Sequence, residues 1–144
     1  MSDNNYVVSE WIIRTGNFLE RAANNKNQSL ELEILTQAKS LLQEGEDKSL
    51  PESNAEVLRL MNRLAMRARH FGKAQRYAQL LFNKTRRDYY AATELLAQAM
   101  YHRGKMVDAL EHLELVPDAR LTRASRKRKS DVAQITVLTR ASEA

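Results

Sequence analysis

One pattern of residues occurs twice in this chain, at a spacing of 32 residues. The first copy consists of Leu64-Ala65, His70, Gly72-Lys73 and Leu81, and the second of Leu96-Ala97, His102, Gly104-Lys105 and Leu113. Repetition near this length, with a Gly between two stretches of helical periodicity, is typical of stacked helical hairpins. The pattern therefore favours an array that grips other chains over a catalytic scaffold.

The composition supports the same fold class. Gly occurs four times and Pro twice in 144 residues, while good helix formers are plentiful, so we predict an all-α protein with a single domain over residues 1–144. Cys is absent, which excludes disulfides and thiolate chemistry and fits a reducing compartment. No basic leader and no run of 18 apolar residues is seen, so we expect a cytoplasmic protein without a membrane span.

Charge is distributed unevenly along the chain. Residues 1–56 carry ten acidic and five basic side chains, for a net charge of −5, whereas residues 57–144 carry eight acidic and eighteen basic side chains, for a net charge of +10. The basic half predicts an acidic partner, a nucleic acid or an anionic surface. The alternative interpretation is that these cations form ordinary solvated helix faces.

An acidic N-terminal helical hairpin is predicted over residues 9–45. Apolar residues recur at three- and four-residue steps from Ser9 to Ala23, which predicts a helix with Ser9 as its cap. The second helix is predicted from the stripe of Leu32, Leu35, Ala38, Leu41 and Leu42. We expect Gly45 to end this helix and the polar stretch up to Pro51 to be a flexible joint.

Two further hairpins are predicted over residues 53–116. A capping box that begins at Ser53 starts the first hairpin, Asp88 caps the start of the second, and Gly72 and Gly104 are the predicted turns. The predicted core residues are Val57, Leu60, Met61, Leu64, Ala65, Ala68, Ala74, Tyr77, Ala78, Leu81 and Phe82, then Ala92, Leu95, Leu96, Ala99, Met100, Met106, Ala109, Leu110 and Leu113. Residues 118–141 are predicted to form a basic segment and a C-terminal capping helix.

These two hairpins resemble tetratricopeptide repeats over about two fifths of the chain. The residues that match the family pattern are Leu96, Ala97, Met100, Ala109 and Leu113 around Gly104, and Met61, Leu64, Ala65, Ala68 and Leu81 around Gly72. Tyr77 departs from the pattern, because the family prefers Ala at its position. An ordinary antiparallel bundle is the alternative architecture. The layout of an N-terminal hairpin followed by repeats also resembles that of small bacterial secretion chaperones, including those of type III systems.

The resemblance implies a concave groove lined by the first helix of each repeat. It places in this groove Asn62, Met66, Arg69, His70, Glu94, Gln98, Tyr101 and His102. Polar groups mixed with one Met and one Tyr suit the capture of a peptide. The function expected from the resemblance is that of a protein-binding adaptor or chaperone, with a secretion-system subunit as one implied client.

The basic segment supports an alternative function. It comprises Arg120, Arg123, Arg126, Lys127, Arg128 and Lys129. These cations could neutralise the phosphates of a nucleic acid or dock an acidic protein. However, nucleic-acid modules commonly interleave aromatic residues with their cations, and this segment contains none. Self-association through an unclosed end of the array is a further alternative.

No catalytic residue, metal site or cofactor is expected. The two Gly-Lys pairs lack the first Gly and the hydroxyl residue of a phosphate-binding loop. His70, His102 and His112 are the only histidines, and no cluster of carboxylates accompanies them. The sequence therefore predicts a protein that is not an enzyme.

Overall fold

The computed structural model describes residues 2–50, 54–85, 89–131 and 134, and every regular element within these ranges is helical. The helices are α1 (Ser2–Asn24), α2 (Glu31–Asp47), α3 (Ala55–Arg67), α4 (Phe71–Lys84), α5 (Tyr89–His102) and α6 (Met106–Glu114). A short 3₁₀ helix, η1 (Gln28–Leu30), precedes α2, and another, η3 (Asp118–Arg120), comes after α6. Residues 123–131 are also helical. The predicted all-α fold class is confirmed.

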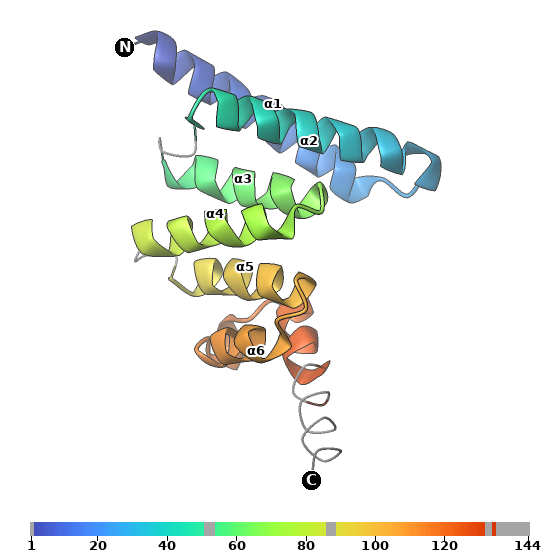
Figure 1. The fold of residues 1–144 in the computed structure, drawn as a ribbon, viewed down its shortest axis with the longest axis vertical. Helices are drawn as coiled ribbons and strands as arrows, with labels where there is room; N and C mark the ends of the chain where they lie inside the picture. The colour runs from blue at the N-terminus through green and yellow to red at the C-terminus, as the bar shows by residue number, and fades with distance from the viewer. Residues whose placement is uncertain (1, 51–53, 86–88, 132–133, 135–144) are drawn as a thin grey trace.

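The helices are stacked in chain order, as Figure 1 shows, with the hairpin of α1 and α2 at one end of the stack and α6 towards the other. Successive helices from α3 to α6 pack against one another, and both α1 and α2 pack against α3. One apolar core runs through most of the stack, from Trp11 in α1 to Ala99 in α5. The core positions predicted for α3 and α4 are buried, except that Phe82 is half-buried at the edge.

The N-terminal hairpin differs from its prediction in where its helices begin and in which face α2 buries. The first helix begins at Ser2, so Ser9 lies inside it and does not cap it. In α2 the buried residues are Ile34, Ala38, Leu42 and Gly45. Leu32, which was predicted to face the core, is 75% exposed. The predicted stripe and the observed face differ in rotation about the helix axis, because packing against both α1 and α3 selects the face that is buried.

Gly45 lies inside α2 and does not end the helix. A Cβ atom at this position would lie 2.7 Å from Sδ of Met61 and 3.1 Å from Cζ2 of Trp11, both closer than ordinary packing allows. Met61 and Trp11 are fully buried, and the Trp11 indole donates a hydrogen bond to the Leu41 carbonyl at 3.1 Å. The missing side chain therefore lets α1, α2 and α3 meet closely.

The acidic side chains of α2 are paired with cations on other helices. Glu44 accepts two hydrogen bonds from Arg14 of α1, at 2.8 and 3.0 Å. Glu46 forms an ion pair with Lys73 of α4 at 3.0 Å. Leu50, inside the segment predicted to be a flexible joint, is buried in the common core. The hairpin is therefore attached to the following helices through both ion pairs and apolar packing.

The two turns recur after 35 residues, although the sequence pattern recurs after 32. The first turn has a positive φ of 61° at Arg69, and the second has a positive φ of 79° at Gly104. In each turn the residue after the positive φ donates its N–H five residues back, to the Ala65 carbonyl at 2.8 Å and to the Met100 carbonyl at 2.9 Å. This is the Schellman arrangement, which ends a helix with one left-handed residue.

Gly72 is therefore not a turn residue. It lies in the first turn of α4, where Phe71 is already helical. In the 35-residue register Ala74 and Ala109 are equivalent, and both are fully buried small residues of a second helix. The 32-residue pattern thus aligned Gly104, which forms a turn, with a Gly that does not.

The cap of α3 is one residue later than predicted, and several other predicted caps lie outside the described residues. Asn54, not Ser53, precedes α3, and its Oδ1 accepts the N–H of Val57 at 2.8 Å. Ser53, Pro51 and Asp88 lie outside the described residues. Most of the predicted capping helix lies outside them as well, and the helix at residues 123–131 contains part of the basic segment.

Candidate functional site

A groove lies between the first helices of the three hairpins, α1, α3 and α5. Its volume is about 340 Å³. It is lined by Leu19, Ala23, Asn62, Arg63, Met66, Arg67, Leu95 and Gln98. We call this the α1–α3–α5 groove. Because each of the three hairpins contributes its first helix, the stacking of the hairpins itself forms this site.

The walls of the groove combine an apolar surface with positive charge. Leu19 and Ala23 come from α1, Met66 from α3 and Leu95 from α5. The charged lining residues are two arginines, and the lining contains no carboxylate. Arg63 is exposed and makes no ion pair or hydrogen bond within the described part of the chain. The groove can therefore offer a free guanidinium group beside an apolar wall.

Arg67, the second cation, is held in place by Glu31 of α2. Its guanidinium donates two hydrogen bonds to the Glu31 carboxylate, one of them 3.1 Å long. The hydrogen bond from Arg67 keeps the pKa of Glu31 below its ordinary value, although partial burial opposes this shift. This pair joins α2 to the end of α3 and orients Arg67 at the rim of the groove.

Asn62 is a fully buried polar residue of the groove lining. Its Nδ2 donates to the Ala74 carbonyl at 2.8 Å, which fixes the orientation of the amide because the flipped form would place two acceptors together. Its Oδ1 has no donor among the described residues. A buried acceptor without a donor costs free energy, and this oxygen lies beneath the groove surface, where it is shielded from solvent.

The structure brings only some of the predicted groove residues to this site. Asn62, Met66 and Gln98 line the groove, whereas five others lie outside it. Arg69 and His70 form the exposed turn between α3 and α4. Five lining residues were not predicted for the groove: Leu19, Ala23, Arg63, Arg67 and Leu95. Leu19 and Ala23 were missed because they reach the groove only through the packing of α1 on α3.

Glu94, Tyr101 and His102 belong to a separate cluster near the basic segment. Glu94 Oε1 accepts the backbone N–H of Thr122 at 2.7 Å, at the start of the helix of residues 123–131. Arg128 lies over the Tyr101 ring, 5.6 Å from its centroid. The His102 ring stacks on Phe71 with a centroid distance of 4.9 Å. These contacts attach the helix of residues 123–131 to α5, and the end of α5 to the start of α4.

The environment of His102 favours the neutral form of its imidazole ring. Partial burial lowers the pKa of His102, and the positive charge of Arg128 lowers it further. The neutral imidazole is therefore favoured at neutral pH, and it can stack on Phe71 without bringing a second positive charge close to Arg128.

Half of the basic segment is engaged in contacts within the chain. Arg126 donates to the Leu121 carbonyl at 3.3 Å, Lys129 pairs with Asp118 at 3.0 Å, and Arg128 covers Tyr101. The other three cations, Arg120, Arg123 and Lys127, are exposed and have no partner among the described residues. The surface available to a partner is thus smaller than the sequence indicates.

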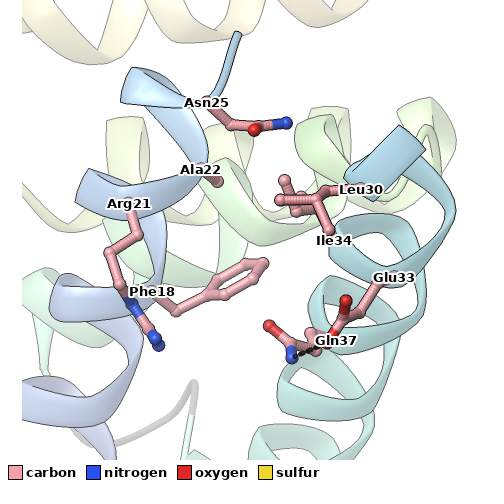
Figure 2. Close-up of a pocket in the computed structure, with 8 residues that line it drawn as sticks. All are labelled: Phe18, Arg21, Ala22, Asn25, Leu30, Glu33, Ile34 and Gln37. Atoms are coloured by element: carbon pink, nitrogen blue, oxygen red, sulfur yellow. Dashed lines mark hydrogen bonds between the residues drawn. The ribbon is translucent and has the colours of Figure 1, made fainter. Parts of the chain in front are cut away.

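A second cleft lies between α1 and α2 on the hairpin that ends the stack. Figure 2 shows its lining side chains, with Phe18, Ala22 and Ile34 in the cleft between the two helices and Arg21 and Glu33 on opposite sides. Its volume is about 240 Å³. This α1–α2 cleft is the smaller of the two, and only one hairpin forms it.

A polar cluster between α2 and α4 was not predicted from the sequence. The Tyr77 hydroxyl donates to Glu46 at 2.8 Å and accepts from Arg76 at 3.2 Å, and Lys73 also donates to Glu46 at 3.0 Å. Burial and the hydrogen bond to Glu46 raise the pKa of Tyr77 to about 12. Burial alone would raise the pKa of Glu46, but its hydrogen bonds from Tyr77 and Lys73 outweigh burial and lower it.

No group of three His, Asp or Glu side chains in the described part of the chain is arranged to hold a metal ion. None of the described helices has the length and apolar character needed to cross a bilayer. No protein-family model matches the chain, and no curated protein or solved structure shows significant similarity to it.

Proposed function

We propose that this chain is a non-enzymatic protein-binding adaptor or chaperone that holds a client polypeptide in the α1–α3–α5 groove. The observation that carries the proposal is the groove itself, which three successive hairpins line with apolar side chains, the free guanidinium of Arg63 and no carboxylate. Polypeptides bind such surfaces by inserting apolar side chains and hydrogen-bonding their polar groups at the rim.

The finer parts of this proposal rest on the sequence. Tetratricopeptide-like stacking and a client from a bacterial secretion system follow from the resemblance of the repeated hairpins. A cytoplasmic location is proposed because the sequence contains no Cys and no long apolar run. The Schellman turns are compatible with such stacking, because they give both repeated hairpins the same backbone geometry. We propose no cofactor and no metal for this function.

The proposal is tested by a pull-down from native lysate. We expect proteins retained by the wild type to be lost with the double variant Met66→Ala and Gln98→Ala, because both side chains line the groove. Val107→Ala is the matched control, since Val107 is an exposed apolar residue of α6 outside the groove. Equal retention by all three proteins would refute the groove assignment.

One observation favours nucleic-acid binding as a second candidate function. The structure places the rings of Tyr101 and His102 beside Arg128, so the basic segment gains in space the aromatic neighbours that it lacks in sequence. Such rings can stack on bases next to a cationic track. Treatment of the same lysate with nuclease decides between the candidates, because retention that depends on nucleic acid is lost after treatment.

A further inference from the structure

We propose that the α1–α3–α5 groove selects an acidic amphipathic segment of its protein partner. In this arrangement an apolar side chain enters the groove, and carboxylates on the neighbouring turn lie beside Arg63 and Arg67. The inference rests on the proposed function, because it names the kind of polypeptide that the groove takes.

The size of the groove limits what enters it. At about 340 Å³, it lies at the small end of the range of roughly 300 to 1,000 Å³ that is usual for ligand pockets. It therefore accepts one or two side chains and leaves the backbone of the partner at the rim. Met66 can adapt its shape to the side chain that enters, because its thioether chain is flexible and polarizable.

The charge of the lining decides which side chains flank this anchor. Of the two lining arginines, Arg67 forms an ion pair with Glu31, whereas Arg63 has no ion-pair partner within the described residues. No lining residue carries a negative charge. A partner with carboxylates near its apolar anchor meets complementary charge, whereas a basic partner meets like charge and is rejected.

A nucleic acid fits the same surface less well. Its phosphates would match the two arginines, but the lining contains no aromatic ring on which bases could stack, and its apolar wall would stay uncovered.

The experiment uses two synthetic amphipathic helices of roughly four turns with the same apolar face. One carries Glu and the other Lys on its polar face, and fluorescence anisotropy measures the binding of each labelled peptide to the full chain. We expect the acidic peptide to bind about ten-fold more tightly than the basic one. Arg63→Glu should weaken binding of the acidic peptide about five-fold and strengthen binding of the basic one.

Lys39→Glu is the matched control. It reverses an exposed charge on α2, outside the groove and outside the basic segment, and should change neither affinity. Met66→Ala should weaken both peptides, because it shortens the apolar wall. Circular dichroism verifies that each variant is folded.

The outcomes separate the inference from the proposed function. If both peptides bind equally and Met66→Ala weakens both, the groove takes polypeptides without regard to charge, and the inference is wrong while the function stands. If neither peptide depends on Met66, both are wrong. If instead a labelled single-stranded oligonucleotide binds tightly and Arg63→Glu abolishes its binding, the groove takes nucleic acid and the inference is also overturned.

Discussion

Gly45 and Gly16 give opposite predictions for the same substitution. Both glycines lie inside helices, where Ala is favoured over Gly by about 1 kcal/mol because it restricts the unfolded chain and keeps the helix better. A Cβ at Gly16 would meet nothing within 4 Å. Gly16→Ala should therefore stabilise the protein by about 0.5–1 kcal/mol.

At Gly45 the same gain is opposed by steric overlap. The new Cβ would lie 2.7 Å from the sulfur of Met61 and 3.1 Å from the Trp11 ring, and both side chains are fully buried. Overpacking of a core costs about 1–3 kcal/mol. The net expectation for Gly45→Ala is a loss of about 1 kcal/mol, which corresponds to a fall in melting temperature of about 3 °C.

Urea unfolding of both variants, followed by circular dichroism, measures these two free energies against the wild type. The prediction is that Gly45→Ala is less stable than Gly16→Ala by about 1.5–2 kcal/mol, because only the Cβ at position 45 meets buried side chains. If Gly45→Ala stabilised the protein as much as Gly16→Ala, the close meeting of α1, α2 and α3 at Gly45 would be wrong.

Two further predictions concern the turns and the polar cluster. Arg69 has a positive φ of 61° in the first turn, and Gly104 has a positive φ of 79° in the second. Thermal unfolding should show that Arg69→Gly stabilises the fold by up to about 1 kcal/mol and that Gly104→Ala destabilises it by a similar amount. A loss of stability in Arg69→Gly would contradict the assignment of the turn. Tyr77 has a pKa raised from 10.0 to about 12, so its protonated hydroxyl contributes stability that is complete below about pH 10 and is lost as the pH rises towards 12. The difference in unfolding free energy between the wild type and Tyr77→Phe should therefore shrink across this range, and a constant difference would exclude a role for that proton.

The fold class and the core of α3 and α4 could be predicted from the sequence because their apolar residues follow the helical period without ambiguity. Leu64, Ala65 and Leu81 are buried as predicted. In α2 several apolar residues compete for the core, and tertiary packing buries Ile34, which lies between α1 and α2, in place of Leu32. Helical periodicity alone carries no information about that choice.

The turns and the groove were harder to predict for different physical reasons. A Schellman turn prefers Gly but does not require it, so Arg69 gave no signal while Gly72 gave a false one. The prediction of Asn62, Met66 and Gln98 as groove residues came from their place on the first helices. Arg63 was missed although it is their neighbour in sequence, and Leu19 was missed because only the tertiary arrangement brings α1 to the groove.

Because the helices are stacked in chain order, the uneven charge of the sequence becomes an uneven distribution of charge along the length of the molecule. Among the described residues, those up to residue 56 carry nine acidic and five basic side chains, a net charge of −4, and lie towards one end of the stack, whereas those from residue 57 carry six acidic and fifteen basic side chains, a net charge of +9, and lie towards the other. This separation of charge gives the molecule a permanent dipole along its long axis, which orients it as it approaches a charged surface. The molecule should therefore approach an anionic surface with the α6 end of the stack first, and added salt should weaken this orientation.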